Sequence, residues 1–230
     1  MKSGKITGEA VRHRSYDDAC GAAHALDLVG ERWALLVIRE LMFGPKRFGE
    51  LRGSLPGISA NVLTQRLEGL EAAGVLCRRR LGPPVSAQVY ELTPWGYESE
   101  PIFQTLGRWA ARSPSHDPTL PFSAASLMLS LRTMLDPDRA GGLDLRIGWR
   151  LGDEIFVTRL SGGRIEAARA DSLEGADVVL TGAPPVLAGA IYGGQPLAVL
   201  EGAGVLRIEG DRTAAERFVT LFPLPAKVGR

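Results

Sequence analysis

Hydrophobic residues recur at helical spacing through the first half of the chain. The spacing predicts helices over Asp18–Val29 and Arg32–Phe43, a short helix with Phe48 and Leu51 inward, and a helix that begins after Ser59. Ser59 suits the N-cap position, because its hydroxyl can accept a hydrogen bond from a free N–H of the first turn. Four helical segments in succession therefore precede any predicted strand.

The helix over Arg32–Phe43 has a clear apolar side. We expect its charged residues to face solvent, because an unpaired charge is rarely buried. The outward residues are then Arg32, Arg39 and Glu40, and the buried ones Trp33, Leu36, Val37, Ile38 and Leu41.

The pattern changes from helical to extended after Gly74. Two alternating segments, VLCRRRL and AQVYELT, flank GPPVS, which predicts a hairpin with Gly82–Pro84 at its tip. Thr93 and Pro94 then read as an N-cap and first-turn proline of a further helix, in which Trp95, Ile102, Leu106 and Trp109 recur. Helices followed by a two-stranded wing and another helix are the layout of a winged helix-turn-helix.

A proline-rich stretch, RSPSHDPTLP, divides the chain near residue 116. Beyond it the pattern predicts an apolar helix over Phe122–Leu135, several alternating strands and a closing helix over Asp211–Phe222. The expected fold class is α+β, with a mainly antiparallel sheet and packed helices in the second half. The predicted units are a flexible basic N-terminal arm (1–17), a winged helix-turn-helix domain (18–112), a linker (113–121) and a ligand-binding domain (122–230).

Composition narrows the class of protein. The chain of 230 residues has 45% hydrophobic and 23% charged residues, and only two cysteines and three histidines, in no metal-binding spacing. Neither a signal peptide nor a membrane-spanning run is apparent, so we expect a cytoplasmic protein without metal or cofactor. Phosphate-binding loops and a nucleophile elbow are also absent from the sequence, so we do not expect an enzyme.

The helix after Ser59 carries chemistry suited to DNA. With Leu63, Leu67 and Leu70 inward, a rotation of about 100° per residue points Asn61 and Gln65 away from the core, with Thr64 and Arg66 on the flanks. Amide side chains can bond to the adenine edge and threonine can contact the thymine methyl. The alternative interpretation is an ordinary surface helix.

Basic residues accompany this helix on both sides. Arg78, Arg79 and Arg80 on the wing, and Lys46 and Arg47 before the short helix, are suited to neutralise phosphates without reading sequence. A solvated charge run is the alternative for the arginines. The full set of expected DNA contacts is Lys46, Arg47, Ser59, Asn61, Thr64, Gln65, Arg66, Arg78, Arg79 and Arg80.

Residues 18–112 resemble the HxlR family of bacterial transcriptional regulators. The resemblance rests on ALDLVGERWALLVIRELMFGPKRFGELRGSLPGISANVLTQRLEGLEAAGVLCRRR and on YELTPWG. It implies a homodimer, formed through the first helix and the helix after the wing, that binds a near-palindromic operator in double-stranded DNA. Several members use a cysteine before the first helix as a redox sensor, and Cys20 matches it, although Gly21 stands where the family often has proline. The alternative for Cys20 is a semi-buried cysteine of the dimer interface. Cys77 is expected to serve packing.

The second half is similar to sterol-carrier-protein domains. The likeness rests on GVLRIEGDRTAAERFVTLFPLP and ADVVLTGAPPVLAGAIYGG, and it implies an apolar tunnel for a lipid-like molecule. The alternative is that the tunnel candidates are simply core residues. These candidates are Leu127, Leu131, Trp149, Phe156, Leu187, Ile191, Leu200 and Phe218.

Two functions remain open at this point. One is a dimeric DNA-binding regulator, expected to be a repressor, whose C-terminal domain senses a small apolar ligand. The other is a non-enzymatic lipid carrier or interaction protein whose winged helix serves dimerisation. The wing arginines and the neutral face of the helix after Ser59 favour the first.

Overall fold

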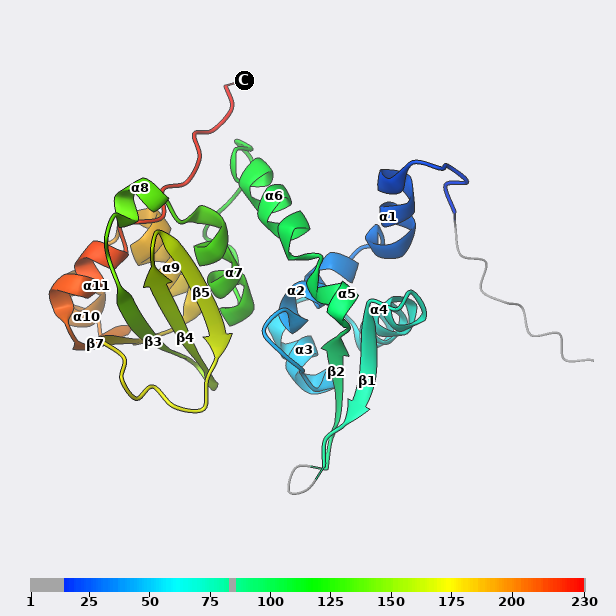
Figure 1. Cartoon of the computed structure of the whole chain (residues 1–230), viewed down its shortest axis with the longest axis horizontal. Helices are drawn as coiled ribbons and strands as arrows, with labels where there is room; N and C mark the ends of the chain where they lie inside the picture. The colour runs from blue at the N-terminus through cyan, green and yellow to red at the C-terminus, as the bar shows by residue number, and fades with distance from the viewer. Residues whose placement is uncertain (1–14, 83–85, 230) are drawn as a thin grey trace, which may run out of the picture.

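The structure is a computed structural model that describes residues 15–82 and 86–229. Most of the predicted N-terminal arm and two of the three predicted tip residues of the hairpin lie outside these ranges. Figure 1 shows two bodies side by side, a mainly helical one and one built around a sheet. We call residues 15–112 the winged-helix domain and residues 122–229 the C-terminal domain.

The winged-helix domain has the predicted order of elements. Four helices precede an antiparallel hairpin, in which Leu76 pairs with Leu92 and Arg80 with Gln88. Two further helices close the domain. Its elements are α1 (Gly21–Val29), α2 (Ala34–Leu41), α3 (Phe48–Ser54), α4 (Ala60–Ala72), β1 (Leu76–Arg80), β2 (Gln88–Leu92), α5 (Pro94–Tyr97) and α6 (Glu100–Ala111).

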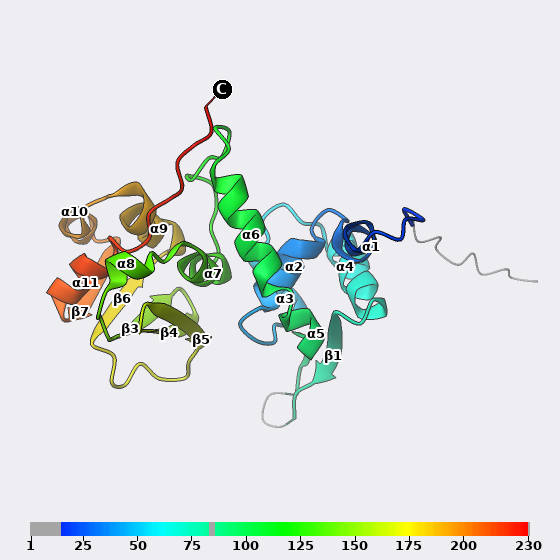
Figure 2. The ribbon, with the colours of Figure 1, turned by 45° about the horizontal axis from the view of Figure 1, so that its top comes forward.

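The segment after the wing forms two helices where the sequence predicted one. Thr93 is the N-cap of α5, as predicted, because its Oγ1 accepts a hydrogen bond from the Gly96 N–H at 3.0 Å. Pro101 then stands in the first turn of α6, where its missing N–H cannot extend the helix from α5. The division lets α6 leave the wing in a new direction, toward the C-terminal domain (Figure 2).

Helix α2 corrects one expectation about burial. Glu40, predicted to face solvent, is completely buried, whereas Leu36, predicted to be buried, is 37% exposed. Glu40 is three residues after the buried Val37, so both side chains lie on the same side of the helix. The charge is accommodated because hydrogen-bond donors surround it, as described below.

The C-terminal domain is a five-stranded sheet with helices over one face (Figure 2). The strand order is β5-β4-β3-β6-β7, in which the pair β3–β6 is parallel and all the others are antiparallel. The mainly antiparallel sheet was predicted, but the placement of β6 beside β3 was not. The elements are α7 (Ala124–Met134), α8 (Pro137–Ala140), β3 (Leu145–Leu151), β4 (Glu154–Ser161), β5 (Arg164–Arg169), β6 (Val178–Gly182), α9 (Pro184–Gly193), α10 (Leu197–Gly202), β7 (Leu206–Gly210) and α11 (Arg212–Phe218).

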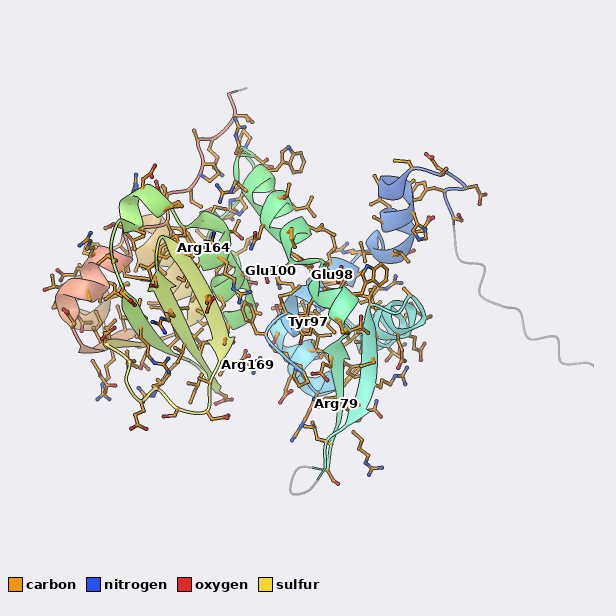
Figure 3. The ribbon with its side chains drawn as sticks, in the orientation of Figure 1. Arg79, Tyr97, Glu98, Glu100, Arg164 and Arg169 are labelled. Carbon is orange, nitrogen blue, oxygen red and sulfur yellow. The ribbon has the colours of Figure 1, made fainter. Side chains whose placement is uncertain are left out.

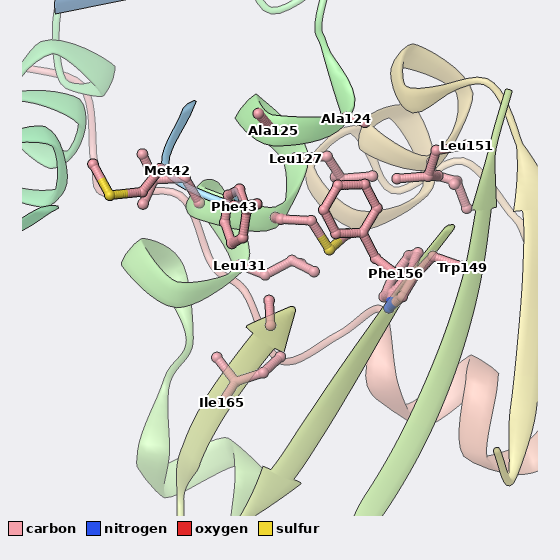
Figure 4. Packing of buried hydrophobic residues seen from close by; sticks show 14 of the residues in the cluster. Met42, Phe43, Ala124, Ala125, Leu127, Leu131, Trp149, Leu151, Phe156 and Ile165 are labelled. Carbon is pink, nitrogen blue, oxygen red and sulfur yellow. The ribbon is translucent and has the colours of Figure 1, made fainter. Parts of the chain in front are cut away.

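The two domains share one hydrophobic core. Phe43, which follows α2, meets Phe156 of β4 edge to face with 5.7 Å between ring centroids. Figure 4 shows Phe43 among Leu127 and Leu131 of α7, beside Phe156 and Trp149. Burial of these aromatic rings stabilises the contact between the two domains, so the domains are held in one relative orientation.

None of the helices within the described ranges combines the length and the apolar character needed to cross a membrane.

Candidate DNA interface and C-terminal groove

Helix α4 is held in register by its cap and its buried side. Ser59 adopts an extended backbone, and its Oγ accepts a hydrogen bond from the Val62 N–H at 3.3 Å. Leu63, Leu67 and Leu70 are at most 2% exposed. The predicted phase of the helix is therefore confirmed.

The opposite side of α4 is polar and open. Asn61, Thr64 and Gln65 are all exposed, and the acidic Glu68 comes later in the helix. Amide and hydroxyl groups at the N-terminal end of such a helix can enter the major groove and contact base edges. The arrangement is chemically able to read sequence.

The three wing arginines differ in their surroundings. Arg78 pairs with Glu71 and Arg79 with Glu91, each at 2.8 Å. Arg80 is exposed and has no carboxylate partner among the residues that the structure describes. Figure 3 shows Arg79 on the wing, away from the C-terminal domain. Arg80 is thus the wing cation that is free to neutralise a phosphate without first losing a partner.

Two residues that were predicted to contact DNA have side chains that are not exposed at the surface. Lys46 is 2% exposed, and its ammonium lies 3.2 Å from Glu40 Oε2, so it does not reach the surface. Arg66 is partly buried and pairs with Glu31 at 3.1 Å. In this structure both side chains are held in ion pairs with carboxylates of the winged-helix domain. Arg47 is exposed, as the prediction requires.

Sequence reasoning missed one exposed cation near α4. Arg52 lies on α3, is exposed, and makes no ion pair within residues 15–82 and 86–229. The signal was available, because Arg52 directly follows the inward Leu51 in the helix that precedes α4. Arg52 thus joins Arg47 and Arg80 as an exposed cation of the winged-helix domain with no carboxylate partner among the described residues.

The ends of the winged-helix domain carry exposed apolar side chains. Leu26 of α1 is 51% exposed, and Ile102, Leu106 and Trp109 of α6 are 43%, 42% and 74% exposed. The three α6 residues fall on one side of that helix at spacings of four and three. Large apolar groups left in water on one side of a helix are typical of a surface that meets a partner.

Cys20 directly precedes α1 and is exposed. The backbone N–H of Ala23 first, and that of Ala22 next, can donate hydrogen bonds to its thiolate and hold the pKa of Cys20 below its ordinary value. Cys77, which was expected to serve packing, is also exposed on β1. Leu76 and Leu92 fill the buried side of that hairpin, and Cys77 faces the other way.

The residues predicted to line an apolar tunnel form the core of the C-terminal domain. Trp149 packs against Phe218 with 5.7 Å between ring centroids, and its Nε1–H donates to Thr158 Oγ1 at 3.0 Å. This corrects the tunnel assignment, because side chains in mutual contact leave no room for a ligand. The six that are completely buried are Leu127, Leu131, Trp149, Phe156, Leu187 and Phe218; Ile191 and Leu200 are 6% and 8% exposed.

A surface groove of about 480 Å³ lies at the edge of this core. Of the predicted tunnel residues, Ile191 lines it, together with Leu197 and Phe222. Its polar wall includes Tyr192, whose hydroxyl oxygen lies 2.6 Å from Ser130 Oγ and whose pKa is raised by burial. Arg139 and Glu216 also line it. The groove can accept an apolar chain and offers one cation.

A helix-turn-helix followed by a basic two-stranded wing defines a winged-helix DNA-binding protein. The family model described as HxlR-like helix-turn-helix matches residues 28–117, and the model described as alkyl sulfatase C-terminal matches residues 118–227. The chain is 38% identical over 86 residues to the HTH-type transcriptional regulator YodB of Bacillus subtilis, which covers 37% of this chain and 77% of YodB. The chain therefore belongs to the HxlR-like transcriptional regulators, which bind DNA.

The chain is also similar to a second regulator and to several solved structures. The HTH-type transcriptional regulator sll1512 of Synechocystis is 40% identical over 84 residues, which is 36% of this chain and 62% of that protein. YodB has been solved in a reduced and a quinone-bound form; the reduced form is 35% identical, with a TM-score of 0.39 over 43% of this chain and 98% of YodB. The sec-alkylsulfatase Pisa1 from Pseudomonas is 22% identical, with a TM-score of 0.40 over 43% of this chain and 16% of the enzyme.

Proposed function

We propose that this protein is a homodimeric repressor that binds a near-palindromic operator through α4 and the wing. The observation that carries the proposal is the separation of α4 into a buried leucine side and an open side with Asn61, Thr64 and Gln65. Arg80, which has no carboxylate partner within residues 15–82 and 86–229, supplies a cation for phosphate. Where the operator overlaps a promoter, a bound dimer would exclude polymerase sterically, which is the mode of repression that we propose.

Exposed apolar residues on α1 and α6 support the dimer. Leu26, Leu106 and Trp109 stand in water in the single chain, and a second copy related by two-fold symmetry would bury the same residues twice. Such a pair presents two α4 helices to successive major grooves. The expected half-site spacing is then about 34 Å or a multiple of it.

DNA titration tests this proposal directly. The protein is titrated with duplex DNA from upstream of its own gene and with a random duplex of equal length, each at about 50 and 200 mM salt. Preference for the upstream duplex and a steep negative slope of log affinity on log salt are expected. No binding at the lower salt contradicts the proposal and favours the carrier or interaction protein.

For the C-terminal domain we propose a sensor of amphiphiles with an alkyl chain, without catalysis. The groove beside Ile191 and Leu197 supports it. Arg139, which also pairs with Asp136 at 3.4 Å, is the lining cation proposed to meet an anionic headgroup. The similarity to alkyl sulfatase C-terminal domains also points to molecules with an alkyl chain. The similarity to sterol-carrier-protein domains stays part of this proposal.

Decyl sulfate below its micelle concentration is a suitable probe. Calorimetry should show saturable binding that is lost in Leu224→Asp, because Leu224 lines the groove and is 38% exposed, so that the change does not disturb the core. Release of inorganic sulfate from the probe would contradict the non-enzymatic role. Equal binding by Leu224→Asp would contradict the site.

A second candidate signal is oxidation or alkylation of Cys20. It is favoured by the exposure of the thiol and by its lowered pKa, which increases the thiolate fraction near neutral pH. Its test is operator affinity before and after treatment with an electrophilic quinone, with Cys20→Ser as the control. An unchanged affinity of the modified wild type contradicts it.

A further inference from the structure

Polar groups bridge the two domains inside their shared core. Glu40 of α2 is completely buried, and its Oε1 accepts a hydrogen bond from Ser123 Oγ at 2.7 Å, across 83 residues of sequence. Ser123 also caps α7, the first helix of the C-terminal domain. A buried carboxylate must be satisfied by donors, and Glu40 takes them from both domains: Arg39 and Lys46 belong to its own domain, and Ser123 is the donor that it would lose if the domains separated.

Lys46 joins the same bridge from the other side. Its ammonium lies 3.2 Å from Glu40 Oε2 and 3.4 Å from Glu154 Oε2, which belongs to β4 of the C-terminal domain. Glu154 also pairs with Arg169 at the end of β5, and Figure 3 shows Arg169 at the edge of the sheet that faces the winged helix. One carboxylate of the C-terminal domain thus holds a lysine of the winged-helix domain.

The same lysine holds elements that surround the DNA-binding surface. Its backbone exchanges two hydrogen bonds with Tyr90 of β2, at 3.0 and 2.9 Å, which attaches it to the wing. Its ammonium lies 3.3 Å from Ser54 Oγ at the end of α3. Glu154, Lys46, the wing and α3 therefore form one continuous chain of contacts.

From this chain of contacts we infer that Glu154 is a positioning residue for DNA binding, acting through Lys46 on the wing and on α3. The inference rests on the proposed function. It assigns the C-terminal domain a part in the DNA-binding geometry, although Glu154 touches no exposed residue of α4. A ligand that displaced β4 would change the pose of the wing by the same contacts.

The sign of a substitution effect separates this role from simple electrostatics. A carboxylate repels DNA phosphates, so removing one by itself leaves DNA affinity unchanged or raises it. A positioning role requires the opposite result. Glu154→Gln keeps the shape of the side chain and removes its charge, so it should weaken DNA binding.

The matched control is Glu209→Gln. Glu209 pairs with Arg150 at 3.1 Å inside the C-terminal domain, where both side chains are well exposed. Operator affinity should fall about 3- to 10-fold in Glu154→Gln and by less than about 2-fold in Glu209→Gln. The melting temperature of each variant verifies that it is folded. Equal or tighter binding by folded Glu154→Gln overturns the inference.

Hydrogen exchange in the free protein gives a second readout that needs no DNA. The amides of Lys46 and Tyr90 should exchange faster in Glu154→Gln than in the wild type or in Glu209→Gln, since the lysine is held less firmly. Unchanged exchange overturns the inference. The two failures are distinguishable. If the wild type itself does not bind DNA, the proposed function is refuted, and the wild-type titration alone shows this.

Discussion

Charged residues serve opposite purposes in two regions of this molecule. Around α4 the useful cations are exposed and unpaired, as Arg80 and Arg47 are, within the described residues. At the junction of the domains Lys46, the immediate neighbour of Arg47, is buried between Glu40 and Glu154. The difference teaches that a basic residue near a recognition helix can be structural, and that only its surroundings decide which role it has.

The buried side of this comparison should give the largest effect. Glu40→Ala removes the acceptor of Ser123 and leaves the buried Lys46 with Glu154 as its carboxylate partner, and we expect a loss of about 3–5 kcal/mol in the free energy of unfolding. Urea denaturation measures it. The exposed pair supplies the control, since Glu209→Ala should cost no more than about 1 kcal/mol. If Glu40→Ala and Glu209→Ala lost similar free energies of unfolding, the buried and exposed carboxylates would not differ in their effect on stability.

The exposed side should give a smaller effect, and on DNA binding instead of folding. Gln65→Ala removes an amide from the open side of α4 and should cost about 1–3 kcal/mol on the operator, with a weaker preference over random DNA. Fluorescence anisotropy measures both. Glu68→Gln, later on the same helix, is the matched control and should not reduce the preference. Equal losses on operator and random DNA would argue against base reading by Gln65.

The cap that sets the phase of α4 should matter less. Ser59→Ala removes the acceptor of the Val62 N–H, at an expected cost of about 1 kcal/mol in stability. Thermal unfolding measures it. Ser59→Asp keeps an acceptor and should restore stability. A neutral effect of Ser59→Ala would mean that packing of the leucines alone fixes the helix.

The smallest effect concerns the reactivity of Cys20. Its lowered pKa means that the thiolate is already present at a pH where an ordinary cysteine, with a pKa of about 8.5, is still protonated. In a Cys77→Ser background, the rate of alkylation by iodoacetamide against pH should therefore have its midpoint below that of a cysteine peptide. A midpoint at or above that of the peptide contradicts the stabilisation by α1.

What could be predicted from the sequence depended on local contacts. The phase of α4 and its cap rest on residues within a few positions of one another, so spacing was sufficient to place them. The bond from Ser123 to Glu40 spans 83 residues, and no local pattern reveals it. The helical spacing puts Glu40 on the same side of α2 as Val37. Glu40 was nevertheless predicted to face solvent, because it is charged.

The C-terminal domain shows the same limit in another form. The similarity to sterol-carrier-protein domains named Trp149, Phe156 and Phe218 as tunnel candidates, with core residues as the alternative. All three are buried, but the sequence could not separate a core from a tunnel wall. That distinction depends on whether side chains from distant strands and helices fill the space. The position of β6 beside β3 is equally non-local, because a parallel neighbour requires a long crossover.

Salt dependence of operator binding tests the division between the two regions most directly. Arg80→Ala should reduce the steepness of log affinity against log salt by about 0.9, because one phosphate contact is lost. Lys46→Met should weaken binding while leaving the steepness unchanged, since Lys46 is buried and acts by position. If Lys46→Met reduced the steepness as Arg80→Ala does, Lys46 would contact phosphate, and the separation of buried from exposed charges would be wrong.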